Sequence, residues 1–446
     1  NCSMETPFKD AVWIMADTDG DASPTHRYYL YTASFDVTAD APVTLYISAF
    51  SQYAVFVNDT FADAGVFEDY DFHPVYDTID LTPLCKPGRN TLTVGHYVCG
   101  ENFSTRAKGT PGVIFAVLQD GKTIAASSAK TQSTHDTRYL DTHERLTYQL
   151  GFNFEFDARA SLPPFRDSLP VEKTRALTPR PIEKLTVSAP IDAKLMAQGI
   201  FRENDASLPK AARMYTAFLS AKPFSAVSRT ASGNHLAFGE NDTADGLYFL
   251  YDLGGETAGY LSFSCDVPED TEILVGFGEH YEDLRVRSLL GTRNFCFRFV
   301  AKKGHNDFFY PFQRIGLRYL QLHVYAKEAT LQNVGVLPTD YPLTVYPCPT
   351  DDGLHKLIYE VGVKTLRMCM HEHYEDCPWR EQSLYGMDSR IQILCGYYAF
   401  REFRFPRASL ALMARSFRPH DALLELCAPG RVSITIPSFT AIFLRE

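Results

Sequence analysis

Hydrophobic residues in the first third of the chain recur at every second position. Val43, Leu45 and Ile47 alternate with polar or smaller residues, which is the period of a strand with one buried face. The following segment, YAVFV, runs into an Asn-Asp pair at positions 58–59 that tolerates a tight turn. A run of short strands punctuated in this way predicts that residues 1–165 form an antiparallel β-sandwich of the jelly-roll or lectin kind.

The pattern of hydrophobic and polar residues changes between about Ser161 and Lys210. The segment LPPFRDSLPVEKTRALTPRPIEK is rich in proline and weakly periodic, as linkers are. Further along, the alternating segments GYLSFSCDV, EILVGFG, FCFRF and RYLQLHV are separated by turn residues. The pattern predicts that residues 166–345 comprise a linker followed by a second antiparallel β-sandwich.

After Pro347 the hydrophobic period becomes that of a helix. The apolar positions that follow i, i+3, i+4 and i+7 are Leu354, Leu357, Ile358 and Val361. Two more helices are expected in QILCGYYAF and FPRASLALMARSF. Three or four helices cannot close a layer of their own, so residues 346–446 are expected to be the incomplete start of a helical domain. Apolar residues there should be unusually exposed, among them Ile391, Leu394 and Leu412.

Composition and charge exclude several kinds of partner. The 446 residues are 45% hydrophobic and 22% charged, as in ordinary globular proteins. Lys and Arg number 43 against 54 Asp and Glu, a net charge of −11, which disfavours binding to nucleic acid or to an anionic membrane surface. No stretch approaches the roughly 18 apolar residues of a membrane helix. The ten scattered cysteines favour a reducing, cytoplasmic location.

The densest cluster of polar residues is HEHYEDCPWREQSLYGMDSR, at positions 371–390. Its simplest interpretation is the start of a helix, with Asp376 as the cap and Pro378 in the first turn. A solvated helix start, however, does not require two aromatic residues, Trp379 and Tyr385, between its carboxylates. Chemistry at this cluster therefore has to be considered beside the structural interpretation.

Metal binding and thiol chemistry are both disfavoured there. Possible metal ligands are Cys369, His371, His373 and Cys377, but the cluster has no C-x-x-C pair and no H-E-x-x-H motif. We therefore expect neither a metal nor another cofactor. Cys377 is a poor candidate nucleophile, because the neighbouring acids would raise the pKa of its thiol.

Carboxylate chemistry on a sugar fits the cluster better. Glu381 and Asp388 are seven positions apart, so they would share one face if the segment were helical. Arg380 and further carboxylates lie beside them, together with the two aromatic residues. Charged groups of this kind bind sugar hydroxyls in pairs, and aromatic rings cover the apolar faces of a pyranose.

The block DCPWRE, followed by Gly386-Met387-Asp388, closely resembles the D-C-P-x-R-E…D signature of family 78 glycoside hydrolases, the α-L-rhamnosidases. The resemblance extends to DLGGETAGYLSFSCDV and FQRIGLRYLQLHV, which are similar to the β-sandwich that precedes the family's catalytic domain. It implies two or more β-sandwiches followed by an (α/α)6 barrel, of which this chain would hold only the first helices. The implied partners are rhamnose-containing glycosides.

The resemblance also implies roles for individual residues. Glu381 would be the general acid of an inverting hydrolysis. The side chains that bind or line the sugar site would be Asp376, Arg380, Tyr385 and Asp388. Inversion needs a second carboxylate, which in the family lies downstream, beyond Glu446, so the chain is expected to be inactive by itself. The alternative is a non-catalytic β-sandwich module that binds carbohydrate or serves in assembly.

Overall fold

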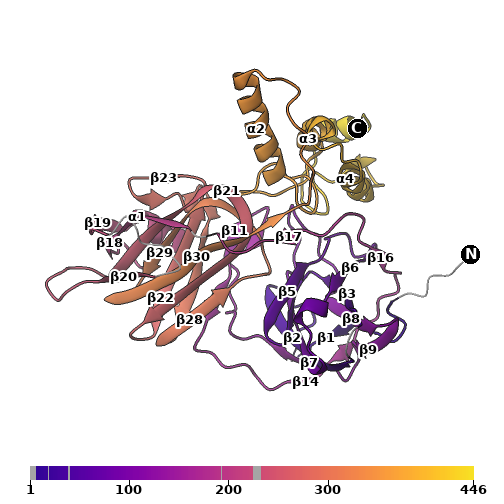
Figure 1. The fold of residues 1–446 in the computed structure, drawn as a ribbon, viewed down its shortest axis with the longest axis horizontal. Helices are drawn as coiled ribbons and strands as arrows, with labels where there is room; N and C mark the ends of the chain where they lie inside the picture. The colour runs from indigo at the N-terminus through magenta and orange to yellow at the C-terminus, as the bar shows by residue number, and fades with distance from the viewer. Residues whose placement is uncertain (1–6, 19, 39–40, 192, 225–232, 446) are drawn as a thin grey trace, which may run out of the picture.

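The computed structural model describes residues 7–18, 20–38, 41–191, 193–224 and 233–445. Two β-regions lie side by side, and helices gather above the place where they meet (Figure 1). The described residues hold five α-helices, four of which follow the last strand of the second β-region. The predicted order of β-structure followed by helices is therefore confirmed.

The first β-region is a sandwich of two sheets with the orders β15-β1-β8-β3-β6-β16, where β9 pairs with β8, and β14-β10-β2-β7-β4-β5. The strands of the first sheet are β1 (Ile14–Met15), β3 (Val43–Phe50), β6 (Val75–Asp80), β8 (Gly112–Gln119), β9 (Lys122–Ala126), β15 (Leu169–Pro170) and β16 (Thr178–Pro179). Those of the second are β2 (Arg27–Val37), β4 (Gln52–Val57), β5 (Thr60–Gly65), β7 (Gly88–Val98), β10 (Gln132–His135) and β14 (Arg166–Asp167). The alternating residues Val43, Leu45 and Ile47 are fully buried between the sheets, as their period predicts.

The second β-region is built around one long strand, β21 (Gly246–Val267). The first half of β21 pairs with β18 and β29, and its second half pairs with β28 and β30. Gly254, with φ of +84°, lies at the register shift between the two halves, where only glycine adopts the backbone without strain. The strands that pair with the two halves of β21 therefore belong to one connected sheet of eleven strands among the described residues.

The other strands of this region are short or medium in length. They are β11 (Arg145–Thr147), β12 (Gly151–Phe152), β13 (Glu155–Asp157), β17 (Thr186–Val187), β18 (Lys194–Arg202), β19 (Phe218–Ala221), β20 (Asn234–Ala237), β22 (Thr271–Gly278), β23 (Tyr281–Glu282), β24 (Arg285–Val286), β25 (Leu289–Leu290), β26 (Arg293–Asn294), β27 (Cys296–Ala301), β28 (Gly304–Phe309), β29 (Ile315–Val324) and β30 (Glu328–Asp340). A short helix, α1 (Lys210–Thr216), contacts β22 and β27.

Strands cross the expected boundary near residue 165 in both directions. Upstream of it, β13 pairs in parallel with β27 of the second region. Downstream, β14 and β15 come from the proline-rich segment and pair at the edges of the first sandwich. Each of these two edge strands is only two residues long, too short for an alternating pattern to predict it.

The apolar core of the second β-region extends onto one sheet of the first, whose own interior is a separate cluster. The Tyr28 ring of the first region stacks on Tyr139 at 3.8 Å, and its hydroxyl lies 2.8 Å from that of Tyr310 in the second. At Gly95, on β7, an added Cβ would lie 2.8 Å from the Phe312 ring. Such close packing resists relative movement, so the two sandwiches form one platform.

The helical part begins where the sequence predicts it. Its elements are α2 (Gly353–Met368), α3 (Gly386–Ala399), α4 (Arg404–Arg415), α5 (Pro437–Phe443) and a small hairpin of β31 (Phe417–Arg418) and β32 (Leu423–Leu424). Asp352 caps α2 by accepting a 2.9 Å hydrogen bond from the His355 backbone, as N-cap residues do. No helix within the described ranges is long and apolar enough to span a membrane.

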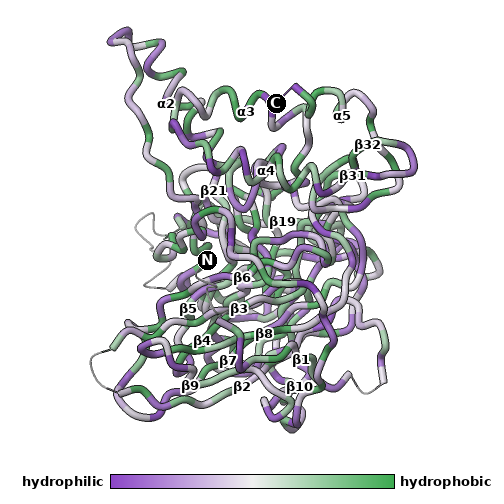
Figure 2. The backbone as a smooth tube through the Cα atoms, turned by 90° about the vertical axis from the view of Figure 1, so that its right-hand side faces the viewer, coloured by the Kyte–Doolittle hydropathy of each residue, from purple (hydrophilic) through white to green (hydrophobic). Residues whose placement is uncertain are grey.

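Apolar residues on two helices face solvent, as predicted, but those on a third do not. Ile391 and Leu394 of α3 are 57% and 47% exposed. Leu412 is fully buried, and its predicted exposure is wrong, because the apolar side of α4 packs inward against Leu366 and Tyr374. The α2 helix extends away from the body of the molecule (Figure 2). Its exposed apolar residues are Leu354, Leu357, Ile358 and Val361.

A buried arginine joins the first sandwich to the helical part. Arg180, in the segment between the β-regions, donates to Asp77 of β6 at 2.5 Å and also to Glu372. Its side chain is 6% exposed, and that of Asp77 is not exposed at all. Burial alone would raise the pKa of the Asp77 carboxyl, but Arg180 and Lys184 outweigh it and lower that pKa.

We expect Arg180→Met to lower the free energy of unfolding by about 3 kcal/mol, the lower end for a broken buried ion pair, because the buried Asp77 then keeps only Lys184 as a cation and the partly buried Glu372 loses its arginine. Urea denaturation followed by tryptophan fluorescence measures the change. The matched control is Arg89→Met, whose partner Asp36 is 3.4 Å away on an exposed surface, and which should cost less than about 1 kcal/mol. Equal effects of the two substitutions would contradict the proposed importance of this buried link.

Candidate active site

The sequence cluster at positions 371–390 is an irregular segment followed by a helix. Residues 371–385, here called the motif segment, contain turns and isolated bridges, and α3 begins only at Gly386 with Tyr385 as its N-cap. The helix-start interpretation, in which Asp376 was the cap, is therefore wrong. The suggestion that Glu381 and Asp388 share a helix face is also wrong, since only Asp388 is helical.

Hydrogen bonds within the motif segment fold it into a compact loop. The Asp376 backbone N–H donates to the Ser383 carbonyl, and the Ser383 N–H donates to Asp376 Oδ1, both at 3.0 Å. Gln382, which has φ of +50°, donates through Nε2 to the Pro378 carbonyl at 2.7 Å. The two hydrogen bonds between Asp376 and Ser383 close a turn over the six residues that lie between them, without regular secondary structure.

The motif segment rests on the second β-region through a buried ion pair. Arg314, which directly precedes β29, pairs with Glu375, whose side chain is fully buried. Burial would raise the pKa of the Glu375 carboxyl, but Arg314 and His371 outweigh burial and lower that pKa. One position along β29, a Cβ added to Gly316 would lie 2.1 Å from the Pro378 carbonyl oxygen. Only glycine leaves room for this contact between the two backbones.

Trp379 is a core residue and does not line a sugar site. Its side chain is 3% exposed, and its ring packs at 4.5 Å from that of Phe295 and at 6.2 Å from that of His280. The aromatic residue that does lie beside the candidate acid is Tyr385. Trp379 therefore has a structural role, and the site role expected for Tyr385 stays a prediction.

Glu381 is held by two donors from different elements. Arg293, on β26 of the second β-region, places its Nη2 at 3.2 Å from Oε1, and the Tyr385 hydroxyl donates to Oε2 at 3.0 Å. The Glu381 side chain is 18% exposed, so it is oriented by the protein and still open to solvent. Nothing in the sequence around Arg293 signals this contact, because it joins residues 88 positions apart.

The other predicted site residues surround Glu381 with further charges. Burial raises the pKa of the Asp376 carboxyl to about 6, and the nearby Glu381 adds to this effect. Burial and Glu381 also raise the pKa of Asp388. The Arg380 backbone interacts with the Cys377 side chain, whereas its guanidinium has neither a hydrogen bond nor an ion pair with any residue that the structure describes. It lies within electrostatic reach of Glu279, whose pKa is nevertheless raised by burial.

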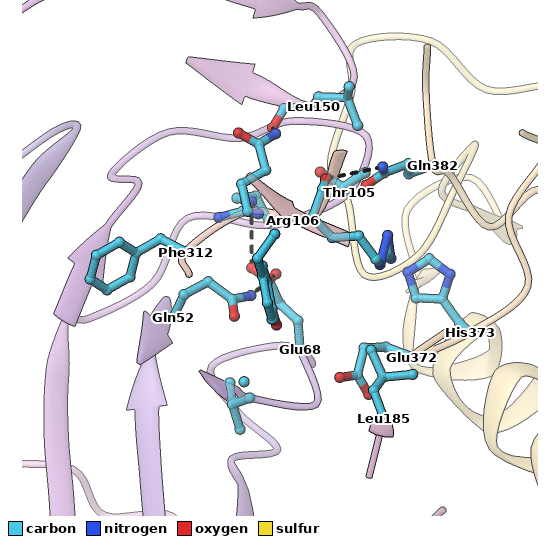
Figure 3. Close-up of a pocket in the computed structure, with 15 residues that line it drawn as sticks. Gln52, Glu68, Thr105, Arg106, Leu150, Leu185, Phe312, Glu372, His373 and Gln382 are labelled. Carbon is cyan, nitrogen blue, oxygen red and sulfur yellow. Dashed lines mark hydrogen bonds and ion pairs between the residues drawn. The ribbon is translucent and has the colours of Figure 1, made fainter. Parts of the chain in front are cut away.

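A separate cavity of about 90 Å³ lies behind the motif segment, where all three parts of the molecule meet (Figure 3). Gln382 and His373 face it from the motif segment, and the Glu68–Arg106 pair, 3.7 Å apart, faces it from the first sandwich. This volume holds about three water molecules and is too small for a sugar ring. It contributes to the junction between domains and does not include Glu381.

Both histidines of the cluster contact other groups of the protein. His371 lies 3.2 Å from Glu375, and His373 Nδ1 lies 2.7 Å from the Tyr374 carbonyl oxygen. Among the residues with described positions, no three His, Cys, Asp or Glu side chains are arranged to hold a metal ion.

Comparison with known proteins gives matches in structure only. No family model matches the sequence, and no curated protein matches it. The fold is similar to that of a family 78 rhamnosidase from Bacillus sp. GL1, with 19% identity and a TM-score of 0.82 over 98% of this chain. It is similar to α-L-rhamnosidases from Dictyoglumus thermophilum (13% identity, TM-score 0.66, 98% of this chain) and from Streptomyces avermitilis in complex with L-rhamnose (14%, 0.61, 92%).

These matches show that the chain has the family 78 glycoside hydrolase fold over nearly its whole length. The chain spans 66%, 48% and 38% of the three proteins, respectively. The resemblance that the DCPWRE block indicates is therefore confirmed at the level of the fold.

The raised pKa of Asp376 predicts how a substitution there depends on pH. The Asp376 carboxyl has a pKa of about 6 in the folded protein, against the usual value of 3.8 in the unfolded chain. Its protonated form therefore contributes stability at low pH, and this contribution is lost as the pH rises through 6. Asp376→Asn should therefore gain stability relative to the wild type between pH 4 and pH 7. Denaturant unfolding at each pH measures the difference.

Asp141→Asn is the control of opposite sign. A hydrogen-bonded pair with Arg27 lowers the pKa of Asp141, so this variant should lose stability relative to the wild type as pH rises. A difference that does not vary with pH for Asp376→Asn would show that its carboxyl ionises normally in the fold.

Proposed function

We propose that this chain carries the acid side of the active site of a glycoside hydrolase of the α-L-rhamnosidase type. The observation that carries the proposal is the Glu381 carboxyl group, which is held by two donors and open to solvent. Three groups suited to sugar hydroxyls, Asp376, Asp388 and the unpaired Arg380, adjoin it. The shared fold with three rhamnosidases supports this assignment.

In the proposed reaction, Glu381 donates a proton to the glycosidic oxygen as the bond from that oxygen to the anomeric carbon breaks. The bonding electrons leave with the oxygen, and Glu381 becomes a carboxylate. Asp376, Asp388 and Arg380 bind ring hydroxyls, since charged groups make the strongest hydrogen bonds to such partners. Tyr385 keeps the acid oriented toward the leaving group.

We further propose that the hydrolysis is inverting and that α2 to α5 are helices of an (α/α)6 barrel. An inverting enzyme needs a second carboxylate about 6.5–9.5 Å from the acid to activate water. We assign this base to none of the described residues. The exposed apolar residues of α2 and α3, among them Leu357 and Ile391, support a helical layer that buries these faces.

The proposed substrate is a terminal α-L-rhamnoside. It is supported by the structurally similar proteins, which are rhamnosidases and one of which is in complex with L-rhamnose. The test is hydrolysis of an aryl α-L-rhamnoside by the protein produced from its complete gene, beside aryl glycosides of other sugars. Saturable rhamnose binding without turnover would instead favour a carbohydrate-binding module.

Glu381→Gln should reduce activity about 10²–10⁴-fold on a rhamnoside with a poor alcohol leaving group, the usual contribution of general acid catalysis. It should reduce activity much less on an activated aryl rhamnoside, whose leaving group needs little protonation. Steady-state kinetics on the two substrates measure both losses.

Asp388→Asn is the matched control, because binding a ring hydroxyl does not depend on the leaving group. This variant should lose activity on both substrates alike. If Glu381→Gln behaves in the same way, Glu381 binds the sugar and is not the acid.

A further inference from the structure

The second β-region reaches the candidate acid through one hairpin, formed by β25 and β26 with Gly291 at its turn. The hairpin is fixed at its base, since Asn153 donates to the Asn294 carbonyl at 3.1 Å and Asn294 donates to the Arg145 carbonyl at 3.3 Å. Arg293 therefore projects from a rigid support.

Two contacts with the same spacing join this hairpin to the motif segment. Phe295 packs on Trp379, and Arg293 pairs with Glu381. Arg293 lies two positions before Phe295, and Glu381 lies two positions after Trp379. The apolar contact fixes the register, so the ionic contact falls on one defined carboxylate oxygen.

The ion pair itself is poorly suited to a purely structural role. Only Nη2 of Arg293 reaches Glu381, and Nε is buried without a hydrogen-bond partner. A stabilising arginine usually makes two parallel hydrogen bonds to its carboxylate, as Arg318 does to Asp252. An unsatisfied buried N–H costs stability, so the geometry of this contact is not the one that would stabilise the fold most.

We propose that Arg293 is a positioning residue that determines which oxygen of Glu381 carries the catalytic proton. This inference rests on the proposed function of Glu381 as the general acid. A guanidinium has five donors and no acceptor, so the Oε1 atom facing Arg293 must keep its lone pair free. The transferable proton then resides on Oε2, beside the Tyr385 hydroxyl, which can donate or accept.

The same contact acts again after proton transfer. The proton leaves Oε2 for the glycosidic oxygen, and the new carboxylate has a positive charge 3.2 Å from Oε1. Arg293 therefore stabilises the product of the acid step. The carboxylates near Glu381 are Asp376 and Asp388, and the cation Arg380 directly precedes it in the chain. The other ionisable groups in reach are Tyr385 and Cys427, whose pKa values burial raises.

The first test measures the titration of the Glu381 carboxyl group directly. The titration is monitored by ¹³C NMR of labelled glutamate carboxyls, and Glu381→Gln assigns the signal. Loss of a nearby positive charge destabilises the carboxylate. In Arg293→Met the Glu381 signal should therefore titrate at higher pH than in the wild type, whereas in Arg293→Lys it should stay near the wild-type position. An unchanged titration in Arg293→Met overturns the proposal, whether or not the protein has activity.

The second test is the pH dependence of kcat/KM on a rhamnoside with a poor leaving group. Arg293→Met should shift the alkaline limb to higher pH and lower the maximal rate about 10- to 100-fold, the range for one charge-assisted hydrogen bond. Arg293→Lys should restore the limb. Arg287→Met, at an exposed arginine between β24 and β25, should change neither quantity.

The outcomes separate this inference from the function on which it rests. If the protein produced from the complete gene is inactive, the proposed function is refuted, and with it the role of Arg293 in catalysis. An active wild type whose pH profile is unaffected by Arg293→Met refutes only the positioning role. If Arg293→Met does not fold, Arg293→Gln removes the charge and keeps N–H donors, and the same shift is required of it.

Discussion

The shape of the motif segment depends on ion pairs with arginines that lie outside it. Glu372 pairs with Arg180 from the segment between the sandwiches, Glu375 with Arg314 at the start of β29, and Glu381 with Arg293 on β26. The motif segment has no regular secondary structure of its own. Because a buried carboxylate without a cation is costly, the pair at the fully buried Glu375 anchors the loop most firmly, whereas the pairs at Glu372 and Glu381 hold partly exposed carboxylates.

This arrangement gives the β-regions a direct part in the chemistry. The continuous core around Tyr28 and Tyr310 makes the two sandwiches one rigid support, and two of the three arginines project from the second. Local hydrogen bonds such as that from Ser383 to Asp376 shape the turn, but they do not place it relative to the rest of the molecule. The orientation of Glu381 is therefore a property of all three parts.

The sequence predicts the elements of this fold better than it predicts their contacts. Alternation at Val43, Leu45 and Ile47 and the helical period after Leu354 are local signals, and both predict what the structure shows. The DCPWRE block likewise identifies the fold. The inward face of α4 at Leu412, in contrast, depends on partners that are distant in the sequence, and periodicity gives the spacing of apolar residues but not the side that is covered.

The structure brings most of the predicted site residues together, but the sequence does not show what surrounds them. Asp376, Glu381, Tyr385 and Asp388 do come together, but Trp379 belongs to the core of the second β-region because Phe295 and His280 cover it. Arg293 lies outside the sequence motif. A contact between positions 88 residues apart leaves no trace in the spacing of a single sequence.

The glycine at position 316 has a consequence for how this molecule divides into parts. A side chain there would collide with the Pro378 carbonyl oxygen, so the strand β29 and the motif segment pack backbone against backbone. Any other residue at this position would push the loop that carries Glu381 away from the strand. The second β-region and the motif segment are therefore one packing unit, although a division by secondary structure would separate them.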